Sequence, residues 1–174
     1  SFTLNEEILE TRRADWILAI TEEEKHYFQT MTEAPVMVLS YGEDDTASDT
    51  TGPEDNTPLP LKQSYVTGFF GSQNYANYHS AIRCCHIAWM SGRIERFILA
   101  GSVCKYSDLC VRLQARYGDW LEIIGFVDTP ADFYDAVDFT TNILAFGSGV
   151  KIKVIESLTY GRPAIGNEVA FEGL

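Results

Sequence analysis

A stretch rich in glycine and lysine, residues 146–156 (FGSGVKIKVIE), carries the strongest chemical signal in the sequence. It directly follows a predicted strand and opens a segment with helical spacing. Glycines let backbone amides approach a ligand closely, and a helix start presents free N–H groups and the positive end of the helix dipole. Lys151 and Lys153 place positive charge in the first turn, where the dipole disfavours cations unless an anion offsets them. The stretch therefore predicts a phosphate or pyrophosphate site.

Glu156 lies on the same helical face as Gly149, Ile152 and Lys153, so its carboxylate should be near this loop. A carboxylate there could accept hydrogen bonds from both hydroxyls of a ribose. A purely structural alternative is that the glycines make a tight turn, the lysines are solvated and Glu156 pairs with Lys153. The spacing fits neither a Walker loop nor a dinucleotide fingerprint. The chemistry of the stretch leaves both interpretations open.

Alternating strands and helices from residue 64 onward place this stretch in an α/β domain. We expect strands at 64–70, 96–100, 121–124, 139–144 and 163–165, and helices at 74–91, 107–117, 130–136 and 150–160. Strands separated by such helices pair in parallel through right-handed crossovers, which predicts a doubly wound, Rossmann-like sheet. Ligands bind such sheets beyond the carboxyl ends of the strands. A ligand site is therefore expected at the turns that follow the predicted strands, after Phe70, Gly101, Gly125, Ala145 and Gly166.

The first 62 residues have a different organisation. A helix is expected over residues 3–13 and a strand over 15–20, followed by a helix that Thr21 and Glu24 could open with a capping box. A short strand follows at 36–39. Residues 42–62 contain six acids, no base before Lys62 and no periodicity, which indicates a linker or loop.

Composition excludes several classes of protein. The formal charge is −12, from 13 Lys and Arg against 25 Asp and Glu, which disfavours nucleic acid and anionic membrane surfaces as partners. No apolar run reaches the length of a membrane span, so we expect a cytoplasmic location. Four cysteines with no Cys-x-x-Cys spacing are expected to be reduced and mostly buried: Cys84, Cys85, Cys104 and Cys110. His79 and His86 lack a third ligand for a metal.

Residues 69–174 resemble the C-terminal, donor-binding domain of retaining GT-B glycosyltransferases of the group 1, family 4 type. Several motifs that carry this resemblance occur in the family's order, and the match over 147–174 is the most specific: residues 70–74, 98–101, 124–127, 133–138, 147–156 and 161–174. Residues 14–24 resemble the last strand and helix of the family's N-terminal, acceptor-binding domain. The resemblance thus implies a remnant of that domain over 1–41, the linker over 42–62, and a donor domain over 63–174 truncated from a longer enzyme.

The resemblance implies a function and a set of donor-binding residues. The diphosphate would be held at 147–153, Glu156 would bind the ribose, and the base would lie near Gly101 and against Gly125 and Phe126, where Phe126 either stacks on it or is core. The full set is Gly71, Ser72, Gly125, Phe126, Gly147, Ser148, Gly149, Val150, Lys151, Lys153 and Glu156. The implied activity is transfer of a sugar from a UDP-sugar or GDP-sugar to a glycan, lipid or other acceptor, without cofactor or metal. The acceptor side would come from the missing N-terminal domain, so this fragment alone should be inactive.

Two departures from the family pattern qualify this expectation. Ser148 stands where many members have a second glutamate that contacts the transferred sugar, and Ser72, Gln73 and Asn74 stand where many have an arginine and a lysine. Lys151 or Lys153 could supply the missing positive charge. Two alternatives follow: a non-catalytic nucleotide-binding or scaffold module of the same fold, or a nucleotide-sugar epimerase of GT-B shape.

Overall fold

The computed structural model describes residues 9, 11–39, 62–144, 146 and 151–172. The chain divides into two compact units, a smaller one within Ser1–Asp44 and a larger one formed by Asp45–Gly147 and Lys151–Phe171. The expected linker falls almost entirely outside the described residues. The loop at 147–150 does so completely.

The smaller unit is a βαβ element. Strands β1 (Ile17–Ala19) and β2 (Val36–Val38) pair in parallel, and helix α2 (Glu22–Gln29) connects them. Thr21 caps α2 by accepting a hydrogen bond from the Glu24 amide at 3.1 Å, and the Glu24 carboxylate accepts one from the Ile20 amide at 3.0 Å. The predicted cap is confirmed, with Glu24 bonded one residue earlier than an ideal capping box requires. Of the helix expected over 3–13, only residues 9 and 11–13 are described, and these are helical.

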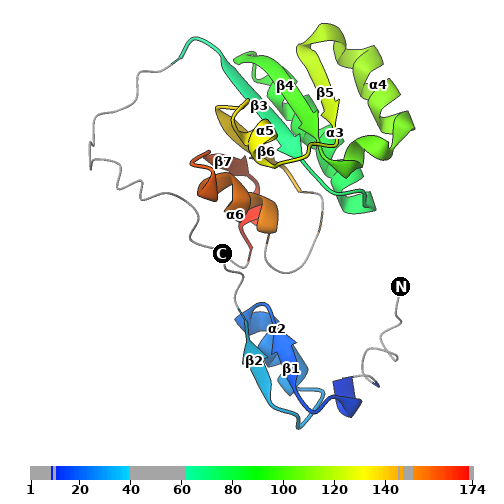
Figure 1. The fold of residues 1–174 in the computed structure, drawn as a ribbon, viewed down its shortest axis with the longest axis vertical. Coiled ribbons are helices and arrows are strands. Elements are labelled where there is room, and N and C mark those ends of the chain that lie inside the picture. The colour runs from blue at the N-terminus through cyan, green and yellow to red at the C-terminus, as the bar shows by residue number, and fades with distance from the viewer. Residues whose placement is uncertain (1–8, 10, 40–61, 145, 147–150, 173–174) are drawn as a thin grey trace, which may run out of the picture. The chain divides into compact units, whose positions relative to one another are not determined.

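The larger unit contains a five-stranded sheet in the order β5-β4-β3-β6-β7, with every pair parallel (Figure 1). Its strands are β3 (Tyr65–Phe70), β4 (Ile94–Ala100), β5 (Leu121–Gly125), β6 (Phe139–Asn142) and β7 (Ala164–Gly166). Each overlaps a strand predicted from the sequence, and the Rossmann-like fold class is confirmed. The chain runs outward from β3 to β5 and then returns to β6 on the other side of β3. The topological switch point, where ligands bind in such sheets, therefore lies between β3 and β6.

Strand β6 is shorter than expected because side chains take over its backbone hydrogen bonds. The prediction extended it to residue 144, whereas the strand ends at Asn142. The Ile143 amide donates to the Cys84 thiol at 3.1 Å, and the Leu144 amide donates to the Asn167 side chain at 3.0 Å. These contacts direct the chain away from the sheet just before the glycine loop.

Helices flank the sheet on both faces, as a doubly wound fold requires. They are α3 (Tyr75–Met90), α4 (Ser107–Tyr117), α5 (Ala131–Tyr134), α6 (Ile152–Thr159) and α7 (Glu168–Phe171), with short 3₁₀ turns η1 (Ser102–Lys105) and η2 (Gly118–Trp120). Buried residues of β4 alternate between two apolar clusters. Phe97 and Leu99 pack with residues of α3 and α4, whereas Ile98 and Ala100 pack with Phe133 of α5.

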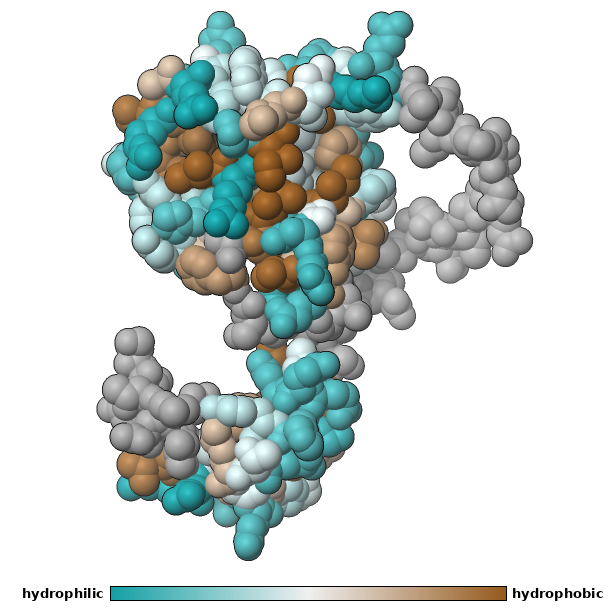
Figure 2. All heavy atoms as spheres, turned by 180° about the vertical axis from the view of Figure 1, so that it is seen from behind, coloured by the Kyte–Doolittle hydropathy of each residue, from teal (hydrophilic) through white to brown (hydrophobic). Residues whose placement is uncertain are grey.

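Hydrophobic residues also reach the surface of the larger unit, where Figure 2 shows them interspersed with hydrophilic ones.

All four cysteines are free, and Cys84 and Cys85 are fully buried. Burial raises the pKa of Cys84, Cys85 and Cys104 to about 12. These thiols therefore stay protonated near neutral pH and act as core residues.

Candidate functional site

A pocket of about 330 Å³ lies at the carboxyl edge of the sheet, next to the switch point. This volume is within the usual range for small-ligand sites. Its walls come from the ends of strands, the first turn of α3 and the start of α6, as follows: Phe70, Gly71, Ser72, Asn77, Gly101, Ser102, Phe126, Val127, Ile152, Lys153 and Glu156. Five of these are residues that the sequence proposed for donor binding.

Two glycines form the closely packed base of the pocket. Gly101 has φ +90°, a region nearly restricted to glycine, and a Cβ there would lie 2.4 Å from the Gly71 carbonyl oxygen. The Gly71 amide donates to Ala100 O at 3.1 Å, and the Gly101 amide donates to Gly125 O at 2.7 Å. These bonds tie the ends of β3, β4 and β5 together. A side chain at Gly101 would separate them.

A polar network holds the turn between β3 and α3. Asn74 caps α3 by accepting a hydrogen bond from the Asn77 amide at 2.8 Å. The side-chain amide of Asn77 donates to the carbonyl and to the hydroxyl of Ser72, each at 3.0 Å. Asn77 is buried, so these bonds fix Ser72 at the wall of the pocket. They leave the Asn77 side-chain oxygen available as an acceptor for another group.

That acceptor binds Lys153, whose ammonium donates to Asn77 Oδ1 at 2.5 Å. The ammonium also lies 4.9 Å from the centre of the Phe69 ring. Among the described residues it forms no ion pair with a carboxylate. Burial, together with a smaller contribution from the neighbouring charge of Lys151, lowers the pKa of Lys153 to about 8. Lys153 is therefore a largely buried cation beside the pocket, and an anionic ligand would stabilise its charged form.

Glu156 is positioned by an aromatic pair. The Tyr134 hydroxyl donates to Glu156 Oε2 at 3.2 Å, and the Tyr134 ring stacks on Tyr160 with centroids 4.7 Å apart. Tyr134 is fully buried, so its hydroxyl is a fixed donor. The ion pair between Glu156 and Lys153 that the structural alternative requires is not present among the described residues, where the Lys153 ammonium donates to Asn77.

Phe126 is 73% exposed and lines the pocket just after β5. Of the two interpretations open from the sequence, core packing is therefore wrong. An exposed ring beside a pocket provides a flat apolar surface on which a planar group can stack.

The remaining predicted residues are distributed differently. Gly125, with φ +74°, ends β5 next to Phe126 and contributes its carbonyl to the Gly101 bond rather than a wall of the pocket. Lys151 is 7% exposed, precedes α6 and does not line the pocket, so Lys153 is the lysine that the fold brings to it. The remaining loop residues, Gly147, Ser148, Gly149 and Val150, lie outside the described part of the chain.

Sequence reasoning missed Asn77 and Ser102. Asn77 connects the β3 turn to α6, and the Ser102 hydroxyl accepts a hydrogen bond from the Gln73 amide at 2.9 Å. An asparagine three residues after a helix cap was a detectable signal for Asn77, since the helix places it on the inner face of the first turn. For Ser102, the one hint was its position after a glycine at a strand end.

The described residues contain neither a cluster of metal ligands nor a membrane-spanning helix. No group of three or more His, Cys, Asp or Glu side chains there is arranged to bind a metal ion. No helix there has the length and apolar character to traverse a bilayer.

By sequence, no protein-family model matches the chain, and no curated protein matches it significantly. By structure, it is similar to TarM of S. aureus, with a TM-score of 0.71 and 12% identity over 99% of this chain and 34% of TarM. It is also similar to Anabaena HepE in complex with UDP and glucose, with a TM-score of 0.64 and 17% identity over 95% of this chain and 47% of HepE. A glycosyltransferase from Rickettsia africae gives a TM-score of 0.66 and 12% identity over 95% and 46% of the two chains.

The chain has the Rossmann-like fold of a GT-B glycosyltransferase domain. The predicted resemblance is thereby confirmed as a likeness of fold. The chain spans about a third to a half of the length of these GT-B structures.

Proposed function

We propose that the larger unit binds the nucleoside diphosphate sugar of a glycosyltransferase, with a UDP-sugar as the donor. The observation that carries the proposal is the pocket at the switch point, where a buried ammonium, a carboxylate and an exposed aromatic ring surround one volume: Lys153, Glu156 and Phe126. UDP is favoured over other nucleotides because structures of HepE and of pneumococcal GtfA, which are similar in fold, are complexes with UDP.

Each wall of the pocket suits one part of such a donor. The ammonium of Lys153 and the start of α6, which has no side-chain cap, offer positive charge and N–H donors to a diphosphate. Glu156, held by Tyr134, offers carboxylate oxygens to the ribose hydroxyls. Phe126 offers its exposed face to the base. Residues 147–150, which lie outside the described part of the chain, remain part of the diphosphate site only as a prediction from the sequence.

In this proposal, catalysis depends on stabilising the leaving diphosphate. Negative charge develops on the diphosphate as the bond to the sugar breaks, and preorganised positive groups lower the barrier to that step. Lys153 and the α6 dipole supply such groups from the protein, without requiring a metal. The acceptor, a glycan, lipid or other molecule, would bind in a domain corresponding to the part of the GT-B structures that this chain does not match.

The pocket gives no support to a scaffold without ligand. In such a module, the partly buried charge of Lys153, which has no carboxylate partner among the described residues, would be a cost to stability with no compensating role. An epimerase of GT-B shape would use the same nucleotide site, and no feature of the described residues favours it.

The proposal is tested by thermal unfolding of this chain with UDP, GDP, ADP and CMP. A ligand at about 100 times its dissociation constant should raise the unfolding free energy by about 2.7 kcal/mol. We expect stabilisation by UDP, its loss in Lys153→Met, and a reduction in Glu156→Gln. Glu168→Gln is the matched control, since Glu168 is an exposed acid on α7 outside the pocket. Equal responses of wild type and both pocket variants, or no response to any nucleotide, would contradict the proposal.

A further inference from the structure

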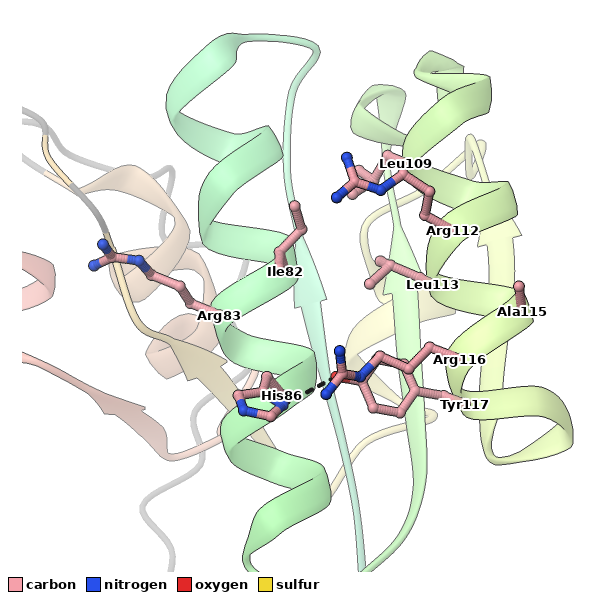
Figure 3. Close-up of a pocket in the computed structure, with 9 residues that line it drawn as sticks. All are labelled: Ile82, Arg83, His86, Leu109, Arg112, Leu113, Ala115, Arg116 and Tyr117. Atoms are coloured by element: carbon pink, nitrogen blue, oxygen red, sulfur yellow. Dashed lines mark hydrogen bonds between the residues drawn. The ribbon is translucent and has the colours of Figure 1, made fainter.

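A second hollow lies between α3 and α4, remote in sequence from the glycine loop (Figure 3). It has a volume of about 590 Å³. Its apolar lining comes from Ile82 on α3, which is partly exposed, and from Leu109 and Leu113 on α4, which are buried beneath it. In Figure 3, Arg112 and Arg116 reach from α4 toward α3, whereas Arg83 points from α3 away from α4. We call this hollow the α3–α4 groove.

Hydrogen bonds between the two helices define the ends of the groove. At one end, Arg112 Nη1 donates to the Tyr78 hydroxyl at 3.1 Å, and that hydroxyl donates to Asp108 at 2.7 Å. At the other end, the His86 ring nitrogen lies 3.2 Å from the Tyr117 hydroxyl. Eight residues of α3 separate Tyr78 from His86, a rise of about 12 Å. The groove is therefore a preformed channel about two helical turns long.

The charge of the groove is opposite to that of the whole chain. Its lining includes three arginines and a histidine but no acid, in a sequence with 25 Asp and Glu and 13 Lys and Arg. None of these arginines, Arg83, Arg112 and Arg116, forms an ion pair with a carboxylate among the described residues. Arg112 and Arg116 are exposed and lie one helical turn apart on the same face of α4. Both can therefore donate hydrogen bonds to one elongated partner. Guanidinium groups pair with carboxylates in bidentate geometry.

We propose that the α3–α4 groove is a docking site for an acidic, amphipathic helix of another protein. Apolar side chains of that helix pack over Ile82 and the surface above Leu109 and Leu113, and its carboxylates pair with Arg112 and Arg116. This is the helix-in-groove mode of recognition, in which residues one turn apart provide the anchors. The site is distinct from the proposed nucleotide pocket, since the two share no lining residue.

The surface beside the groove supports a protein partner over other anions. Ile87 and Met90, one and two turns after Arg83 on α3, are 47% and 71% exposed, so the apolar surface continues along the helix. Methionine, arginine and aromatic residues are enriched at protein interfaces. A channel with an apolar floor suits the side chains of a helix better than a flat lipid surface.

The test uses fluorescence polarisation with a labelled model peptide of about four helical turns. Leucines at i, i+3, i+4 and i+7 give it an apolar face, and glutamates fill its flanks. We expect saturable binding to this chain, and at least a tenfold loss in the double variant Arg112→Glu/Arg116→Glu. A peptide with glutamine in place of glutamate should also bind at least tenfold more weakly. Arg93→Glu is the matched control, because Arg93 is exposed and does not line the groove.

Other results would overturn the proposal. No saturable binding at millimolar peptide, or equal binding by the double variant with unchanged thermal unfolding, would show that the groove does not bind an acidic helix. Binding to phosphatidylserine vesicles in place of the peptide, lost in the double variant, would assign the surface to a membrane. Self-association lost in the same variant would assign it to a second copy of the chain. Stabilisation by UDP is measured in parallel and should be unchanged, which separates this inference from the proposed function.

Discussion

The two hollows of the larger unit present positive charge in opposite ways. In the switch-point pocket, one ammonium is largely buried and held by Asn77, with a carboxylate and glycine turns around it. In the α3–α4 groove, the guanidinium groups of Arg112 and Arg116 are exposed on a helix, and the lining of the groove contains apolar residues but no acid. A fixed buried charge selects a small ligand of defined geometry, whereas exposed arginines on a helix suit an extended partner. The burial of a cation and the hydrogen bonds that hold it therefore determine which kind of ligand it can recognise.

The largest expected effect is a loss of stability when the glycine backbone at the base of the switch-point pocket is changed. Gly101→Ala should lower the unfolding free energy by about 3 kcal/mol or more, because alanine strongly disfavours φ +90° and its Cβ would meet the Gly71 carbonyl oxygen. Urea unfolding measures the loss. The control is Gly92→Ala, at φ +64° with open space around it, which should cost about 1 kcal/mol. Equal losses in the two variants would show that the contact between Gly101 and Gly71 does not restrict the fold.

An intermediate effect concerns pH and the two states of Lys153. Its pKa in the folded chain is about 8, below the ordinary 10.5, so the ammonium loses its proton as pH rises above about 8. UDP affinity should then fall, approaching tenfold per pH unit, because the diphosphate binds the charged form. Calorimetric titrations between about pH 7 and pH 9 measure this fall. If UDP affinity falls equally steeply with pH in Lys153→Met, the fall is caused by another titrating group.

The stability of the ligand-free chain should change in the opposite direction. Between pH 8 and 10.5 the unfolded chain binds more protons at Lys153 than the folded chain does, so this residue makes stability rise with pH. Buried thiols oppose this rise above about pH 9, because their folded pKa values are raised from 9.0 to about 12. The difference between wild type and Lys153→Met in urea unfolding isolates the lysine, because the thiols are common to both.

The smallest expected effect tests whether the two hollows act independently. Phe126→Ala should weaken UDP binding by about 1 kcal/mol, a factor of about five, and leave thermal stability unchanged because the ring is 73% exposed. Binding of the acidic peptide should be the same in this variant as in wild type. Loss of peptide binding in Phe126→Ala, or loss of UDP binding in Arg112→Glu/Arg116→Glu, would show that the two sites are coupled.

Sequence periodicity was sufficient to predict the sheet. Most strands of the larger unit carry a short apolar run, and each strand is followed by a segment with helical spacing, so parallel pairing followed from the length of the connections. The end of β6 was not predictable, because it depends on Cys84 and Asn167, which are distant in sequence from the strand. Local patterns encode local structure, whereas a hydrogen bond across a fold is decided by packing.

The sequence by itself determined the fold class and the neighbourhood of the pocket, because glycines, a helix start and a carboxylate at fixed spacing are local properties. Tertiary structure alone decided which lysine lines the pocket: Lys151 is buried and does not line it, whereas Lys153 does and reaches Asn77 on another helix. It also created the α3–α4 groove, since Arg112 and Arg116 form a site only when α3 lies beside them (Figure 3). The physical reason is that burial and charge neighbours depend on contacts between elements, which no single segment specifies.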